Sequence, residues 1–301
     1  MTLRLVITDL DNTLYDWVTF FATSFRSMTA ELSRLLAAPE DQLLDEFKVI
    51  HERYGTSEPP FAALELPTVQ ARYPGLTRRE IKDRIDSALH AFSSARQKTL
   101  RLYDGVADSL HCLVDAGIVV VGHTEAIMQA GYYRIAKLGV DRFLRRLYVS
   151  HADVPEHPVP GRASELAPPP GYVVVAPPGT RKPNPKLLLD ICAHEGFVPS
   201  EVLYVGDSLT RDIAMAREAG VLSAWAKYGT LYHRELWDIL VRVTHWTHED
   251  VVREERLRDL YGNVRPDHVL ERFRDVLAVV GLVESSPSTD AADGTPRPSG
   301  T

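Results

Sequence analysis

Two aspartates near the start of the chain, Asp9 and Asp11, are the residues whose types and spacing most clearly indicate chemistry. They follow the apolar run 5–7, which is typical of a strand buried on both faces. Alternate residues of an extended segment point to the same side, so the two carboxylates face the same way. Two negative charges held close together repel, which favours a bound cation or a shared proton. Mg²⁺ is the obvious cation, because it prefers oxygen ligands.

Three later stretches carry further polar groups beside predicted strands or helices. Thr124 follows an apolar run, where a hydroxyl can help to hold an anionic oxygen, although a helix N-cap is an equally good interpretation. Lys182, in RKPNP, could neutralise a carboxylate and an anionic ligand, with Arg181 as the competing candidate. Asp207 and Asp212, in GDSLTRD, supply two more carboxylates, which could alternatively favour a helix dipole.

The elements needed to bring these groups together are alternating strands and helices. Apolar runs predict strands at residues 5–7, 118–121, 147–150, 172–176, 202–205 and 221–226. Amphipathic segments predict helices before Gly117 and at residues 126–138, 185–195 and 269–280. Such alternation is typical of an α/β fold, a doubly wound parallel sheet whose ligands gather beyond the carboxyl ends of the strands.

Residues 17–102 interrupt this pattern with a helical insertion that is too long to be a simple connection. Apolar residues recur at helical spacing in segments 20–32, 43–50 and 78–99, and a proline-containing loop is predicted at 56–67.

Three other segments differ from the α/β pattern. Residues 151–171 are rich in proline and predict an exposed, mobile loop, and the low-complexity tail 284–301 predicts disorder. Residues 231–262, rich in charge, Trp and His, predict helices packed on the edge of the core.

The bulk composition is that of an ordinary globular protein of 301 residues, long enough for one large α/β domain with an insertion or for two modest domains. A net charge of −7 and the lack of a basic stripe speak against a nucleic-acid partner. The two cysteines, Cys112 and Cys192, suggest neither a disulfide framework nor a metal site. Neither a signal segment nor a membrane-spanning run is recognisable, so we expect a soluble, cytoplasmic protein without a membrane partner, as a monomer or a homodimer.

The string DLDNTL after a short apolar strand resembles the nucleophile motif of the haloacid dehalogenase-like (HAD) hydrolases. GHTEA, RKP and GDSLTRD resemble the second, third and fourth motifs of that superfamily and occur in the same order. The second motif departs from many relatives, which carry Asn where Glu125 stands. The resemblance implies a Rossmannoid core from residues 1–16 and 103–283, with a helical C1 cap inserted at 17–102.

The resemblance also implies a role for each motif residue. Asp9 would be the nucleophile, and Asp11 would protonate the leaving oxygen and later deprotonate water. Mg²⁺ would be bound by the Asp9 carboxylate, the Asp11 carbonyl and the Asp207 carboxylate, with Asp212 orienting a metal-bound water or the lysine. Thr124 and Lys182 would hold the phosphoryl oxygens.

The implied function is Mg²⁺-dependent hydrolysis of a small phosphorylated metabolite. The start DLDNTLYD resembles pyrimidine 5′-nucleotidase-like members, so a nucleotide is the first substrate to test, with sugar phosphates and phosphoglycolate next. Specificity is predicted near His51, Arg53, Tyr54, Gly55 and Thr56, which could equally form an inert helix-ending turn.

Three alternatives stay open at this point. A phosphomutase would use the same residues. A haloacid dehalogenase is disfavoured because halide departure needs no acid, whereas Asp11 is present. A non-catalytic binding or regulatory protein of the same fold would be expected to have lost the aspartates.

Overall fold

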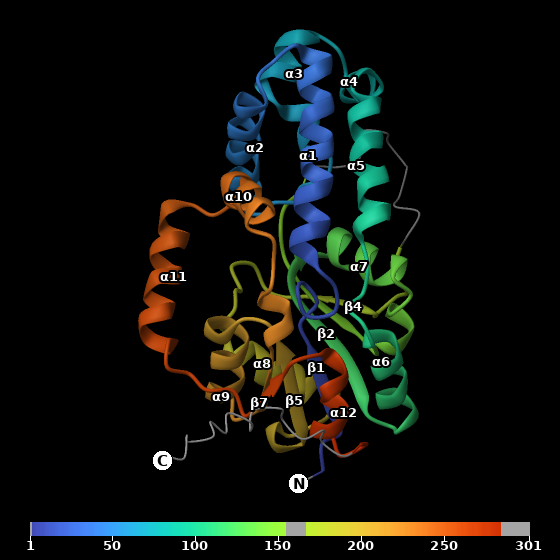
Figure 1. Cartoon of the computed structure of the whole chain (residues 1–301), viewed down its shortest axis with the longest axis vertical. Helices are drawn as coiled ribbons and strands as arrows, with labels where there is room; N and C mark the ends of the chain where they lie inside the picture. The colour runs from blue at the N-terminus through green and yellow to red at the C-terminus, as the bar shows by residue number, and fades with distance from the viewer. Residues whose placement is uncertain (1, 155–166, 284–301) are drawn as a thin grey trace, which may run out of the picture.

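The computed structural model describes residues 2–154 and 167–283. In this part of the chain, seven parallel strands form one sheet in the order β4-β3-β2-β1-β5-β6-β7 (Figure 1). The strands are β1 (Leu5–Thr8), β2 (Val119–Ile127), β3 (Leu147–Ser150), β4 (Val173–Val175), β5 (Val202–Gly206), β6 (Leu222–Ala226) and β7 (His268–Leu270). The predicted α/β fold with a parallel sheet is therefore confirmed.

Strand β1 lies at the centre of the sheet, and each of its residues is buried. Leu5 pairs with Val119 of β2 on one side and with Val202 of β5 on the other. The carboxyl ends of these parallel strands consequently meet at one edge. The chain segments that leave this edge after Thr8 and Gly206 carry the aspartates of the first and fourth motifs.

Helices cover both faces of the sheet, and alternate side chains of the central strand β1 are buried in two different hydrophobic clusters. Leu5 and Ile7 pack with α8 (Pro185–Glu195) and α9 (Ala214–Glu218). Val6, between them, packs in the other cluster with α6 (Val106–Asp115), α7 (Met128–Lys137) and α12 (Val276–Val279). This alternation is that of a doubly wound sheet.

The segment between β1 and α6 is helical, as predicted. Aromatic side chains pack against one another inside this segment: the rings of Trp17, Phe21 and Phe25 are stacked in a row, and Phe47 contacts Phe25 edge to face. The helices stand beyond the carboxyl edge of the sheet (Figure 1). They are α1 (Trp17–Leu36), α2 (Glu40–Tyr54), α3 (Pro67–Arg72), α4 (Arg78–Arg84) and α5 (Asp86–Thr99).

Several predicted elements differ in the structure. The periodic segment 78–99 forms two helices separated at Ile85, and the predicted loop 56–67 contains a short 3₁₀ turn, Ala62–Glu65. The predicted helix 269–280 is shorter in the structure: residues 269 and 270 belong to β7, which pairs with β6, and the helical part comprises the 3₁₀ turn Phe273–Asp275 and α12 (Val276–Val279). Local periodicity could not reveal this non-local pairing.

Helix α10 (Arg234–Val243) packs on the inserted helices α1 and α2, whereas we predicted contact with the core edge. Lys48 of α2 donates to the carbonyl oxygens of Thr244 (3.3 Å) and Trp246 (3.2 Å). Helix α11 (His248–Tyr261) follows and contacts the π-helical turn that begins after β5. The segment after β6 therefore touches both the inserted helices and the core.

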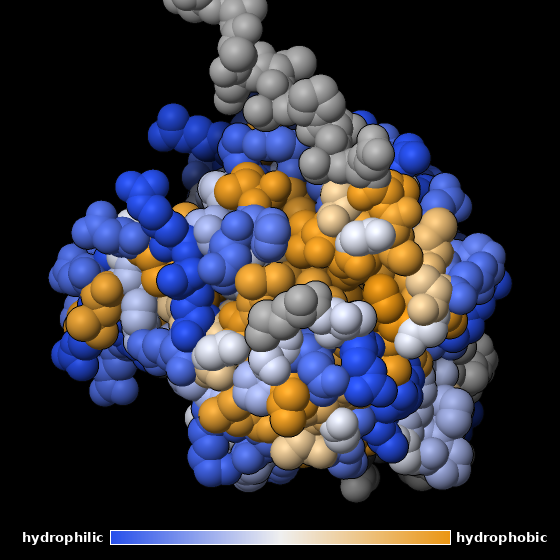
Figure 2. Space-filling model, turned by 90° about the horizontal axis from the view of Figure 1, so that it is seen from below, coloured by the Kyte–Doolittle hydropathy of each residue, from blue (hydrophilic) through white to orange (hydrophobic). Residues whose placement is uncertain are grey.

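The end of the molecule opposite the inserted helices presents hydrophobic and polar side chains side by side (Figure 2). No helix within residues 2–154 and 167–283 is long and apolar enough to cross a membrane. Most of the predicted loop 151–171 and the whole tail 284–301 lie outside the described residues.

Candidate active site

Asp9 is buried immediately beyond the end of β1. Its backbone N–H donates to the Val205 carbonyl (2.8 Å), which fixes the turn against β5. The Thr13 hydroxyl donates to Asp9 Oδ2 at 3.2 Å. Burial raises the pKa of Asp9 to about 7, Asp212 adds to the rise, and Lys182 opposes it. The carboxylate thus depends on nearby positive charge to remain ionised.

Lys182 provides that charge from the loop before α8. Its Nζ donates to Asp9 Oδ1 (2.5 Å), to Asp212 Oδ1 (2.9 Å) and to the His123 carbonyl (3.2 Å). Although burial disfavours the charged form, the two carboxylates raise the pKa of the Lys182 ammonium well above its ordinary value. The competing candidate Arg181 pairs instead with Asp250 of α11.

A cluster of three carboxylates lies around this lysine. Ligand oxygens of Asp9, Asp207 and Asp212 all lie within 4.8 Å of one another. Asp212 approaches so closely because Gly206 has no side chain: a Cβ there would lie 2.5 Å from the Asp212 carboxyl carbon. Burial, with repulsion from the other two carboxylates, raises the pKa of Asp207 well above its ordinary value. The oxygen donors and their mutual repulsion fit a hard divalent cation.

The Asp11 carboxylate is not a member of this cluster. It accepts a hydrogen bond from the Tyr15 hydroxyl (2.7 Å) and another from Arg134 Nη2 (3.2 Å). Burial raises the pKa of Asp11, and Arg134 opposes the rise. The predicted contact of Asp11 with the metal uses its backbone carbonyl and stays a prediction.

Thr124 is buried within β2, which runs on past the predicted end at residue 121. Its hydroxyl accepts the Ala126 N–H at 3.0 Å, in the irregular stretch between His123 and Ile127 where the register with β3 shifts. Helix α7 begins only at Met128. Thr124 therefore does not cap that helix, and its predicted phosphate contact stays a prediction.

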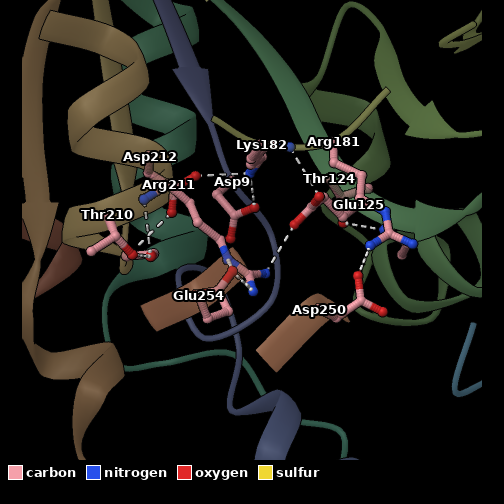
Figure 3. A network of polar contacts seen from close by, with 12 residues as sticks. Asp9, Thr124, Glu125, Arg181, Lys182, Thr210, Arg211, Asp212, Asp250 and Glu254 are labelled. Atoms are coloured by element: carbon pink, nitrogen blue, oxygen red, sulfur yellow. Dashed lines mark hydrogen bonds and ion pairs between the residues drawn. The ribbon is translucent and has the colours of Figure 1, made fainter. Parts of the chain in front are cut away.

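Glu125, whose role the sequence left open, is hydrogen-bonded to the backbone of the loop that carries Lys182 (Figure 3). Glu125 Oε1 accepts the backbone N–H of Lys182 (3.0 Å), and Oε2 accepts from Arg211 Nη1 (3.1 Å). Arg211 also donates to Glu254 of α11 (2.5 Å), and Arg253 donates to the Lys182 carbonyl (2.7 Å). No motif of the sequence predicted these contacts; the high charge of segment 231–262 was the only signal for them.

The predicted specificity residues make contacts among the inserted helices and α10. His51 Nδ1 lies 2.6 Å from the Val243 carbonyl, whereas Arg53 and Tyr54 both pair with Glu65. Thr56, which follows Gly55, accepts the Glu58 N–H through its hydroxyl (3.2 Å). Their predicted part in substrate choice stays a prediction.

Comparisons with known proteins show which protein families the chain is similar to. The sequence profile of the haloacid dehalogenase-like hydrolases matches residues 3–220, and a HAD-hydrolase-like profile matches residues 179–276. The chain is 24% identical to a glyceraldehyde 3-phosphate phosphatase of Methanopyrus kandleri, over 75% of this chain and 85% of that protein. It is 26% identical to an N-acetylmuramic acid 6-phosphate phosphatase of Pseudomonas aeruginosa, over 85% of this chain and 93% of that protein.

A solved structure of similar fold is the 2-haloacid dehalogenase of Pseudomonas syringae pv. Tomato. Its TM-score is 0.55 at 16% identity, covering 92% of this chain and 98% of that one. At this identity the likeness concerns the fold, which agrees with the sheet and the inserted helices described above.

Proposed function

The chain belongs to the haloacid dehalogenase-like hydrolase family, and from this premise we propose that it hydrolyses a small phosphomonoester through a phosphorylated Asp9. The observation that carries the proposal is the buried contact of the Asp9 carboxylate with the Lys182 ammonium, beside two further carboxylates. A nucleophile next to a fixed cation can approach a phosphate dianion without prohibitive repulsion.

The residues of the chain divide the reaction between them. Asp9 attacks phosphorus, so an O–P bond to Asp9 forms while the bond to the leaving oxygen breaks. Asp11 gives its proton to that oxygen and then takes a proton from the water that attacks the aspartyl phosphate. Lys182 and Thr124 hold the phosphoryl oxygens. Inorganic phosphate leaves, and Asp9 returns to its starting state.

A Mg²⁺ ion would be held by Asp9 and Asp207, with Asp212 next to it and the carbonyl of Asp11 as a further ligand. The carboxylate cluster fits this ion, because its oxygens lie close together and Asp9 and Asp212 are buried. When bound, the ion supplies positive charge that stabilises the transferring phosphoryl group.

We propose a phosphorylated sugar or a short phosphorylated carbon compound as the substrate. The two curated relatives named above are phosphatases of such compounds. The nucleotide predicted from the start of the sequence is the second candidate. Residues 17–102 would form the cap, and residues 1–16 and 103–283 would form the core. Helix α10, although it comes from the later part of the chain, would pack with the cap helices α1 and α2.

A panel of phosphomonoesters tests the proposal. The panel contains sugar phosphates, phosphoglycolate and pyrimidine nucleoside monophosphates, each with Mg²⁺ or with EDTA, and a 2-haloacid as the dehalogenase substrate. We expect Mg²⁺-dependent release of phosphate that Asp9→Asn abolishes. The matched control is Asp190→Asn, which alters an exposed pair with Lys186 on the surface of α8.

Other outcomes separate the alternatives. A phosphate ester that changes position on the sugar, without free phosphate, would identify a phosphomutase. A folded protein that is inactive on every substrate would favour a binding or regulatory protein. Halide release without phosphatase activity would contradict the role given to Asp11.

A further inference from the structure

Arg134 of α7 is a fully buried arginine in contact with the predicted acid Asp11. Its side chain is 0% exposed. Nη2 donates to Asp11 Oδ2 (3.2 Å), Nε donates to the Tyr15 hydroxyl (2.9 Å), and Nη1 donates to Glu58 Oε2 (2.6 Å). Each guanidinium nitrogen thus donates to one of these acceptors, and the side chain has no exposed surface with which to meet a substrate.

The acceptor Glu58 comes from the inserted segment, between α2 and the 3₁₀ turn at residues 62–65. Its carboxylate is largely buried, with 15% of the side chain exposed. Two carboxylates from different parts of the molecule, Asp11 beside β1 and Glu58 beyond α2, therefore share one guanidinium. Glu58 thereby connects the inserted segment to the guanidinium that contacts Asp11.

The contacts at Asp11 fix its carboxylate without covering it. The Tyr15 hydroxyl donates to Asp11 Oδ1 (2.7 Å) and Arg134 Nη2 donates to Asp11 Oδ2 (3.2 Å), so hydrogen bonds hold both carboxylate oxygens. A quarter of the Asp11 side chain stays exposed, at 25%. An acid held in one orientation with an open edge is poised to meet a leaving group.

We propose that Arg134 is a positioning residue that orients the Asp11 carboxyl group toward the leaving oxygen. Through Glu58, this orientation depends on the packing of the inserted helices against the core. The inference rests on the proposed function. It adds a link between the inserted segment and the proton-transfer step, carried by one buried guanidinium between two carboxylates.

The dependence on the leaving group separates this role from a merely structural one. p-Nitrophenolate leaves readily without a proton, whereas the alkoxide of a sugar phosphate needs one. A misplaced Asp11 therefore slows hydrolysis of the alkyl ester selectively. A general loss of fold slows hydrolysis of both esters equally. The comparison uses kcat/KM, because this constant reports the step in which the leaving group departs.

The test compares Glu58→Gln with the unaltered enzyme on p-nitrophenyl phosphate and on the best alkyl phosphate of the panel. We expect kcat/KM to fall at least about 10-fold on the alkyl ester and less than about 3-fold on the aryl ester. Asp11→Asn should show the same selectivity with a larger loss. Glu52→Gln, which alters a partly exposed pair with Lys48 on α2, is the matched control and should change neither value.

Arg134→Lys is the second variant, because it keeps a charge in the buried site but loses the fork that reaches three acceptors. It should show the same selectivity for the alkyl ester. Equal losses on the two esters, or no loss in Glu58→Gln, would overturn the inference. If the unaltered enzyme hydrolyses neither ester, the proposed function itself fails, and the two failures are thereby distinguished.

Discussion

Lys182 Nζ lies 2.5 Å from Asp9 Oδ1, although 173 positions separate the two residues in the chain. Asp9 directly follows the central strand β1, and Lys182 lies in the loop that leads into α8. The same ammonium also donates to Asp212 Oδ1, so one positive charge is paired with two buried carboxylates. The first prediction concerns this contact.

Replacing Lys182 by Met should lower kcat by at least about 100-fold, because the charge that faces the transferring phosphoryl group is lost while its bulk is kept. Steady-state kinetics on the best phosphomonoester measure the effect. Lys182→Arg should recover part of the activity. A Met variant with nearly normal kcat would contradict the role assigned to the ammonium.

Glu125→Ala should lower kcat/KM by roughly 10-fold, because the backbone N–H of Lys182 and the Arg211 guanidinium lose their shared acceptor. Glu125→Gln keeps an acceptor oxygen for Lys182 and should cost less. Glu271→Gln, at an exposed pair with Lys227, is the surface control. If Ala and Gln act alike, the hydrogen bond to Lys182 is not what matters.

Asp207→Asn should weaken Mg²⁺ binding, because it removes one charge from the carboxylate cluster. A titration of activity against Mg²⁺ should then need at least about 10-fold more of the ion. Thermal unfolding gives a second readout: Mg²⁺ should raise the Tm of the unaltered protein more than that of the variant. An unchanged Mg²⁺ requirement would place the metal elsewhere.

His51 makes the fold sensitive to acid. Burial lowers its pKa from 6.5 to about 4, so between these values the unfolded chain holds a proton that the folded protein does not. The stability from this group is complete above pH 6.5 and is lost as the pH falls towards 4, by about 3 kcal/mol at most.

His51→Asn removes this titration and keeps a donor for the Val243 carbonyl. The variant should therefore lose less stability between pH 7 and pH 5 than the unaltered protein, as measured by urea unfolding at the two values. Equal losses in the two proteins would show that His51 does not titrate as its burial implies.

Local sequence determined the core elements well. The strand predicted at 5–7 is Leu5–Thr8, because a continuous β-rich apolar run suits a central parallel strand. The helix predicted at 185–195 is Pro185–Glu195: the Asn184 side chain accepts the Leu187 N–H, and the proline occupies the first turn. The motif residues Asp9, Lys182, Asp207 and Asp212 also lie together as the order of the motifs indicated.

Contacts between distant segments were beyond a single sequence. Arg134 resembles any other charged residue on a helix until Glu58 and Asp11 are placed beside it, at 76 and 123 positions away. The packing of α10 on α1 likewise depends on which apolar faces the rest of the fold leaves uncovered. Ion-pair partners and helix docking are decided by tertiary structure, and no local pattern encodes them.

The central claim is that Asp9 carries the phosphoryl group, and trapping the phosphoenzyme tests it most directly. The unaltered protein is mixed with substrate and Mg²⁺, quenched in acid within the first turnover, digested and analysed by mass spectrometry. The account predicts one added phosphoryl group on the peptide that contains Asp9, and none in Asp9→Asn. A phosphoryl group on another residue, or full turnover by Asp9→Asn, would contradict it.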